Sequence, residues 1–478
     1  MLSSNTTLEV ILSGIILLVV GVHFVTKMRY HLSISVVDVS IWMTAVFFGA
    51  GPLVALFFSR RLPAVDPAVM TWSYIVIYLF IIGLFLADNL SLINPRAVRQ
   101  PRSSVFRSTL AHCLRSVTKI NTKQVFIYYI LVWFFRLFLG IKYGIFFSGT
   151  ASSERVTALP YTVVVINMIL KVVSLGCLVW SCGMIWHRRR RTPLPLGILI
   201  LEFAWAFVKG RRWIFEIIVI MALVLRICNL HLKARYVYGA AVMLSFVLLW
   251  VYPTFIAIRV QYKYSDPDDN AVIRYAQTTK AVITDQFKES SDDSTTQLYQ
   301  ENMANRALTP IRFNCSILAA QEGRPLMWGR AIWSTAVWVI PSAIYPQKIE
   351  QPAPEQLVQS HYNFSQSDDA SNWPAYGCAD FGVMGGLFMG LLLGAVLRLI
   401  EKQIIPLTNS HPFVALCLMA GALNGAIFVE ASPTSLWSML RSTVILYCLT
   451  RAASFLRTGG DLAQLRHPSL QRKHAGRI

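Results

Sequence analysis

Residues 161–186 read YTVVVINMILKVVSLGCLVWSCGMIW, and residues 187–191 read HRRRR. The first segment is longer than the roughly 20 residues with which an α-helix crosses a bilayer core of about 30 Å. Only Lys171 places a charge inside it. A basic run directly after such a segment is typical of the cytoplasmic end of a span, and anionic-lipid binding is the second interpretation. The stretch therefore predicts a membrane-spanning helix that ends at the cytoplasm.

The composition extends this prediction to the whole chain. Of its 478 residues, 55% are apolar and 14% are charged, whereas about 25% of the residues of a soluble protein are charged. These values exclude a disordered protein, a disulfide scaffold and an ordinary cytosolic enzyme. Basic cytoplasmic loops account for the formal net charge of +20, so we expect no nucleic-acid partner.

Eleven apolar segments are long enough to be spans, which predicts an all-α polytopic membrane protein. They lie near residues 8–26, 34–58, 68–87, 124–140, 160–186, 194–208, 213–228, 237–256, 377–400, 411–430 and 436–456. The pair 194–208 and 213–228 is short and predicts a tight or partly re-entrant hairpin. Basic residues gather in alternate loops and in the tail. This pattern predicts a multi-pass chain with its N-terminus outside and its C-terminus in the cytoplasm.

The spans divide the chain into four parts. Residues 1–256 hold the first eight spans, residues 377–456 hold the last three, and residues 457–478 form a basic cytoplasmic tail. Residues 257–376 are too many for a bare connection. Their amphipathic stretches predict a large helical cap on the outer face.

Cysteines and metal-binding patterns give little sign of a cofactor. Cys315 and Cys378 are the cysteines in or next to the cap, and we expect buried thiols there rather than a disulfide. The sequence holds no CxxC pair, no HExxH motif and no zinc-like spacing. We therefore expect no metal and no other cofactor.

The turn between the sixth and seventh predicted spans is basic although it is expected outside, whereas basic residues normally gather in cytoplasmic loops. It reads Val208-Lys209-Gly210-Arg211-Arg212-Trp213 and is expected on the outer face. Arginine at a helix N-terminus can bind a phosphate with a fork of hydrogen bonds. The turn therefore predicts a diphosphate-lipid site at the outer leaflet. Snorkelling to lipid phosphates, or pairing with Glu202 or Glu216, is the alternative.

Charges inside the predicted spans allow two interpretations. Glu202 and Glu216 are either ion-pair partners or groups that carry chemistry, and pairing is the favoured interpretation. Arg136 and Lys171 either line the same cavity or form structural pairs. The cap adds a second basic set, in which solvent exposure is the ordinary interpretation: Arg306, Arg312, Arg324, Arg330 and Lys348.

Three segments carry a family resemblance. Residues 339–348 read VIPSAIYPQK and resemble the IPRxxWPxKP signature of the Wzy-type family of bacterial O-antigen, or oligosaccharide repeat-unit, polymerases. Residues 380–386, DFGVMGG, are similar to the family's FGxxG segment, and the basic turn is similar to its GxR element. Ser342 and Tyr345 replace the Arg and Trp of the signature. The resemblance implies a GT-C-like glycosyltransferase in the bacterial inner membrane, with its cap in the periplasm.

The resemblance also implies a reaction and its partners. A growing glycan would move from undecaprenyl diphosphate to an incoming lipid-linked repeat unit, with membrane lipids and a chain-length regulator protein as further partners. Cations must neutralise the leaving diphosphate, and the candidates are Lys209, Arg211, Arg212, Arg306, Arg312 and Lys348. A general base must take the proton of the acceptor hydroxyl, and the candidates are His361, Glu216, Asp368, Asp369 and Asp380.

Three other functions compete with this one. An O-antigen ligase would use the same diphosphate site with a lipid A core acceptor. A lipid or polysaccharide transporter would need a polar path through both leaflets instead of a cap. A membrane transpeptidase would need an outward cysteine with a nearby His and Arg, and Cys315 and Cys378 have no recognisable setting of this kind.

Overall fold

A computed structural model describes most of the chain. It covers residues 4–29, 34–58, 65–90, 122–143, 160–187, 193–209, 211–227, 254, 257–258, 271–287, 293–341, 344–364 and 372–465. Every element in this part of the chain is a helix. Six helical segments are long and apolar enough to cross a membrane: Thr6–Lys27, Val36–Ala55, Pro67–Asn89, Val125–Tyr143, Thr162–Ile185 and Trp373–Ser410. The structure thus agrees with the prediction of an all-α membrane protein.

The remaining predicted spans fall into three groups. Pro193–Ala206, Trp213–Val224 and Pro412–Ile427 are apolar helices too short for the same criterion. The predicted span 436–456 lies within α20 (Pro433–Leu465), which also takes in the first residues of the predicted tail. The predicted span 237–256 lies almost entirely outside the described residues.

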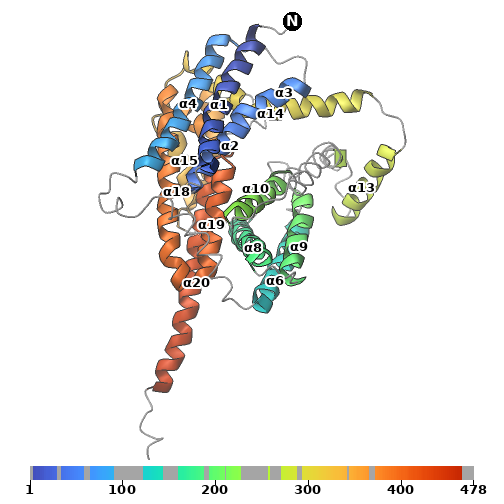
Figure 1. The fold of residues 1–478 in the computed structure, drawn as a ribbon, viewed down its shortest axis with the longest axis vertical. Coiled ribbons are helices and arrows are strands. Elements are labelled where there is room, and N and C mark those ends of the chain that lie inside the picture. The colour runs from blue at the N-terminus through green and yellow to red at the C-terminus, as the bar shows by residue number, and fades with distance from the viewer. Residues whose placement is uncertain are drawn as a thin grey trace, which may run out of the picture.

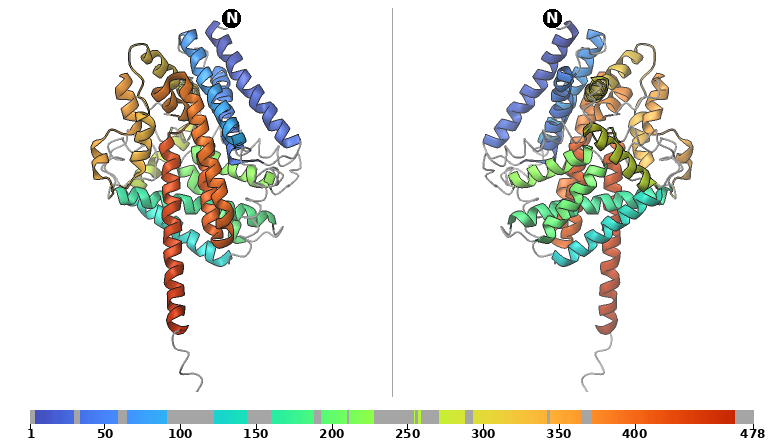
Figure 2. Two further views of the ribbon diagram at one scale, coloured as in Figure 1. Left: turned by 90° about the vertical axis from the view of Figure 1, so that its left-hand side faces the viewer. Right: turned by 90° about the vertical axis from the view of Figure 1, so that its right-hand side faces the viewer.

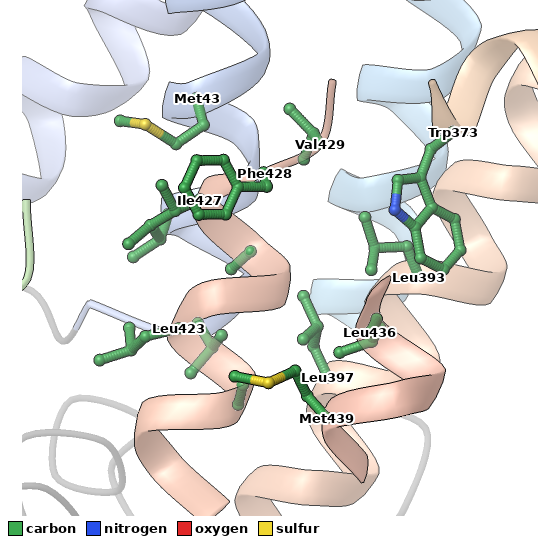
Figure 3. Close-up of a cluster of buried hydrophobic side chains, with 14 of the residues drawn as sticks. Met43, Trp373, Leu393, Leu397, Leu423, Ile427, Phe428, Val429, Leu436 and Met439 are labelled. Atoms are coloured by element: carbon green, nitrogen blue, oxygen red, sulfur yellow. The ribbon is translucent and has the colours of Figure 1, made fainter. Parts of the chain in front are cut away.

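The main bundle runs along the long axis of the molecule (Figure 1). It contains α1 (Ser4–Arg29), α4 (Pro67–Leu90), α18 (Gly385–Ser410), α19 (Pro412–Ile427) and α20. Beside them the predicted span 34–58 is built from three pieces, α2 (Val36–Thr44), the π-helical η1 (Ala45–Ala50) and α3 (Gly51–Phe58). Large apolar side chains from α18, α19 and α20 meet around Trp373 and Met439 in the core (Figure 3).

The contact between α4 and α18 is made largely by backbone. Gly386, Gly390 and Gly394 lie four residues apart on one face of α18. A Cβ at Gly386 would overlap the carbonyl oxygen of Val76, and one at Gly390 would overlap that of Phe80. Small residues at this spacing let two membrane helices approach closely.

Charged side chains join four helices near one end of this bundle. Asp38 of α2 accepts hydrogen bonds from His23 at 2.8 Å and from Lys27 at 3.1 Å, both on α1. On α18, Arg398 donates to Glu401 at 2.6 Å and also bonds Asp88 of α4. These contacts fix the relative positions of α1, α2, α4 and α18.

A second group of helices packs against the side of the bundle. It consists of α6 (Thr122–Tyr143), α8 (Tyr161–His187), α9 (Pro193–Lys209) and α10 (Arg211–Ile227). In Figure 1 helices α8, α9 and α10 lie together to one side of α19, and Figure 2 shows green helices of this group crossing the direction of α20. Gly176 makes the crossing close, because a Cβ there would lie only 2.6 Å from the Cys417 sulfur of α19.

The described part of the predicted cap is helical. It comprises α13 (Ala271–Phe287), α14 (Asp293–Gln321), α15 (Arg330–Val339), η5 (Pro346–Glu350) and α16 (Pro354–Tyr362), and it is followed by α17 (Trp373–Phe381) and η6 (Gly382–Met384). Charges fix both ends of α15. At its start the amides of Ala331 and Ile332 donate to Asp380 at 2.9 and 2.8 Å. At its end Arg441 of α20 donates to the Val339 carbonyl at 2.7 Å. Both charges complement the helix dipole.

Candidate functional site: buried charges beside the basic turn

The basic turn joins α9 to α10, as the sequence predicts. Helix α9 ends at Lys209 and α10 begins at Arg211, with Gly210 between them. The side chains of Lys209, Arg211 and Arg212 lie outside the described residues. The structure does describe the two glutamates of this hairpin, Glu202 and Glu216, and their contacts with other described residues.

Glu202 of α9 forms the centre of the first cluster. Its Oε1 accepts hydrogen bonds from Arg136 of α6 at 2.9 Å, from Tyr129 at 2.6 Å and from Ser174 of α8. The Arg136 side chain is 2% exposed and that of Glu202 is 0% exposed. A buried ion pair of this kind needs such extra hydrogen bonds to offset the loss of hydration. Glu202 is therefore an ion-pair partner, which confirms the favoured interpretation of the sequence.

Glu216 of α10 forms the second cluster. Its Oε2 lies 4.0 Å from the Lys171 amino group of α8, and its Oε1 accepts a hydrogen bond from the Asn424 amide of α19. Glu216 is fully buried. The pairing interpretation is confirmed here too, and the contact attaches α10 to both helix groups.

Trp213 connects the two clusters, and Trp205 packs against the cation of the first. The Arg136 guanidinium lies 4.4 Å from the ring centroid of Trp205 and 5.4 Å from that of Trp213. The Lys171 amino group lies 4.5 Å from the Trp213 ring. Trp213 is the last residue of the basic turn, so Arg136 and Lys171 both contact the turn itself. Cation–π contacts away from water are worth about 2 kcal/mol.

The Glu216 cluster lies towards the cap end of α19. Asn424 is one turn from the end of α19, where the Val429 carbonyl accepts the Trp373 amide at 3.4 Å. Trp373 opens α17, the segment that follows the cap. The start of α10 is therefore held near the place where the cap meets the bundle.

Lys348, the buried cation of the cap, has a structural position. The residue is 3% exposed, and its amino group donates to the Trp338 carbonyl at 3.0 Å and to the Ile340 carbonyl. Burial and the nearby Arg441 guanidinium lower the pKa of Lys348 to about 8. These bonds place Lys348 at the end of α15, beside the segment that resembles the family signature.

Among the other predicted site residues, His361 and Arg312 have described contacts outside the two clusters. His361 lies on the cap, where its Nε2 is 2.9 Å from the Pro325 carbonyl and its own carbonyl accepts from Arg324. Arg312 of α14 interacts electrostatically with Glu9 of α1. The side chain of Arg306, and all of Asp368 and Asp369, lie outside the described residues.

The structure also corrects and adds assignments. Both oxygens of Asp380 accept backbone amides, so its position is that of an anchor for α15 rather than of a general base. Cys315 and Cys378 are free, buried thiols, as predicted. Asn424 was missed, because one amide inside an apolar run gives no signal of the glutamate it contacts.

The comparisons with known proteins gave no relative. No family model matches the chain, and neither a curated protein nor a solved structure matches it. Among the described residues no group of His, Cys, Asp or Glu is arranged to hold a metal ion.

Proposed function

We propose that the chain is a membrane glycosyltransferase of the O-antigen polymerase type with a lipid-diphosphate donor. The observation that carries this proposal is the charge balance around the α9–α10 hairpin. Both glutamates are already engaged by cations of other helices, Glu202 by Arg136 and Glu216 by Lys171. The hairpin and its described ion-pair partners therefore contain two acidic residues and five basic ones. The basic residues are Arg136, Lys171, Lys209, Arg211 and Arg212.

An anion that reaches the turn would balance this excess. Guanidinium groups bind phosphate oxygens in pairs, and Gly210 lets a ligand approach the backbone. The start of α10 also directs free amide groups and a positive dipole end towards such a ligand. The buried contacts of Trp213 and Glu216 hold that start in place. A lipid diphosphate fits both the charge and the apolar surroundings of the hairpin.

The reaction then balances without a cofactor. The bond between the sugar anomeric carbon and the diphosphate oxygen breaks, and undecaprenyl diphosphate leaves with the electron pair. A new bond forms between that carbon and the acceptor hydroxyl oxygen, whose proton passes to a base. His361 and Asp368 remain the proposed bases, whereas Glu216 is held by Lys171 and Asn424. Arg306 and Arg312 remain the proposed cap cations, whereas Lys348 is held by two cap carbonyls.

We propose the arrangement of the chain in the membrane together with the activity. It comprises eleven spans, a GT-C-like architecture, an outside N-terminus and a periplasmic cap in a bacterial inner membrane. Six apolar helices support it. Green helices among α8, α9 and α10 cross the direction of α20 in Figure 2, so they would have to turn towards the direction of α20 to span a bilayer as well.

The test is a reaction in proteoliposomes with synthetic undecaprenyl diphosphate-linked repeat units as the only substrate. We expect longer glycans and released undecaprenyl diphosphate, both measured by mass spectrometry. Arg211→Ala and Arg212→Ala should abolish extension while the protein still inserts. Arg212→Lys should also impair it, because an ammonium group cannot form the fork. Arg226→Ala, at the opposite end of the same helix, is the matched control and should extend normally.

Each other outcome identifies a competing function. Transfer that occurs only after lipid A core is added would make the protein a ligase. Substrate that crosses the bilayer without any new glycosidic bond would make it a transporter. Ladders of normal length from both alanine variants would refute the diphosphate site.

A further inference from the structure

Two tryptophans beside the start of α15 are turned away from the protein. Trp328 is 73% exposed and Trp333 is 69% exposed. Trp328 also has a φ of 50°, a left-handed conformation that is costly for a bulky residue. Backbone bonds hold it there, since Met327 donates to the Ala379 carbonyl at 3.0 Å and Trp328 donates to that of Asp380 at 3.1 Å. The fold thus maintains strain that keeps a large ring exposed.

An apolar stripe on α18 begins near Gly329, the residue that follows Trp328. The Phe381 ring packs against Phe388 with 5.4 Å between centroids, and a Cβ at Gly329 would lie 3.9 Å from Phe381. Met384, Phe388 and Leu399 are exposed along one side of this segment. Because Trp373–Ser410 is apolar enough to cross a membrane, this stripe is its lipid-facing side.

The level of the membrane surface follows from the length of that span. Lys402 is an exposed charge towards the far end of α18. A helix needs roughly 20 residues to cross the hydrocarbon core, and counting back from Lys402 reaches about Gly382. Asp380, to which Trp328 is bonded, stands at this boundary. Tryptophan collects at the boundary between hydrocarbon and headgroups.

We propose that Trp328 and Trp333 anchor the cap in the lipid headgroup layer. Arg324 and Arg330 are exposed on the same segment, and they suit anionic headgroups beside the rings. The anchor sets the height of α15 above the membrane, and with it the height of residues 339–348. It does not depend on the proposed enzymatic activity.

Spin labels measure this position directly in the intact protein. One cysteine is placed at Trp333→Cys, at Trp328→Cys or at the control Glu322→Cys, after Cys113, Cys228 and Cys448 are changed to serine. The protein is reconstituted in nanodiscs of phosphatidylethanolamine and phosphatidylglycerol. Relaxation by oxygen, which concentrates in lipid, is compared with relaxation by a water-soluble nickel chelate.

We expect oxygen to dominate at positions 328 and 333 and nickel to dominate at 322. Because position 333 has ordinary helical geometry, its label reports even where a change at the strained position 328 disturbs the loop. Nickel dominance at both tryptophan positions would overturn the proposal. So would labels that are immobile and shielded from both agents, since a second protein would then cover the patch.

Discussion

The Arg136–Glu202 pair offers the sharpest test of the buried site. Glu202→Gln removes the negative charge and keeps an oxygen that accepts from Tyr129 and Ser174. The Arg136 guanidinium cannot lose its proton to compensate, and it is 2% exposed. Removing one partner of a buried pair costs about 3–5 kcal/mol. The contacts that remain, Ser174 and the Trp205 ring at 4.4 Å, recover about 2 kcal/mol at most.

A second change isolates the charge. Arg136→Met combined with Glu202→Gln leaves no unpaired charge, so the double variant should unfold within about 1 kcal/mol of the unchanged protein. Unfolding by sodium dodecyl sulfate in mixed micelles measures both variants, with exposed Glu322→Gln as the matched control. A loss below about 1 kcal/mol for Glu202→Gln alone would refute the reasoning. A double variant as unstable as that single variant would refute it too.

Three further predictions follow from the packing and the cap. Gly390→Ala should lower the free energy of unfolding by about 1–3 kcal/mol in the same assay, because its Cβ would overlap the Phe80 carbonyl of α4. Gly14→Ala is the control and should be neutral, because nothing lies within 4 Å of a Cβ there. Equal effects of the two changes would contradict the backbone contact. Because the pKa of Lys348 is about 8 in the fold, below its ordinary 10.5, the unfolded chain binds more protons between these values. Thermal stability should therefore rise with pH across that window, and Lys348→Met should abolish the rise; an unchanged rise would assign it to another group. Asp380→Ala removes the acceptor at the start of α15, so the free energy of unfolding should fall by about 0.5–2 kcal/mol. The amides of Ala331 and Ile332 should also exchange hydrogen faster. Unchanged exchange at these two amides would argue against the anchoring role of Asp380.

Much of the fold could be predicted because apolar length is a strong signal in a membrane chain. The ranges of α1, α4, α6 and α8 agree closely with the predicted spans. The break at Gly210 was also predicted, from polar residues between two apolar runs. The crossing of α8 over α19 could not be predicted, because it depends on the contact of Gly176 with Cys417, which lies on a helix far away in the sequence.

The candidate site could likewise be predicted only in part. A carboxylate inside an apolar helix needs a partner, so pairing of Glu202 and Glu216 could be predicted. The sequence does not predict which cation pairs with which glutamate. Arg136 and Lys171 lie on different helices, and only the packing of these helices brings each cation to its partner. The anchoring position of Asp380 depends on amides almost fifty residues earlier in the chain.

The glycine contact between α4 and α18 restricts where the lipid-linked substrate that we propose could enter. A lateral opening between two helices requires side chains that rotate aside, and here the carbonyls of Val76 and Phe80 touch the facing glycines directly. Acyl or prenyl tails therefore cannot slip through this seam without pulling the two backbones apart. A substrate of the proposed kind would therefore have to enter elsewhere than between α4 and α18.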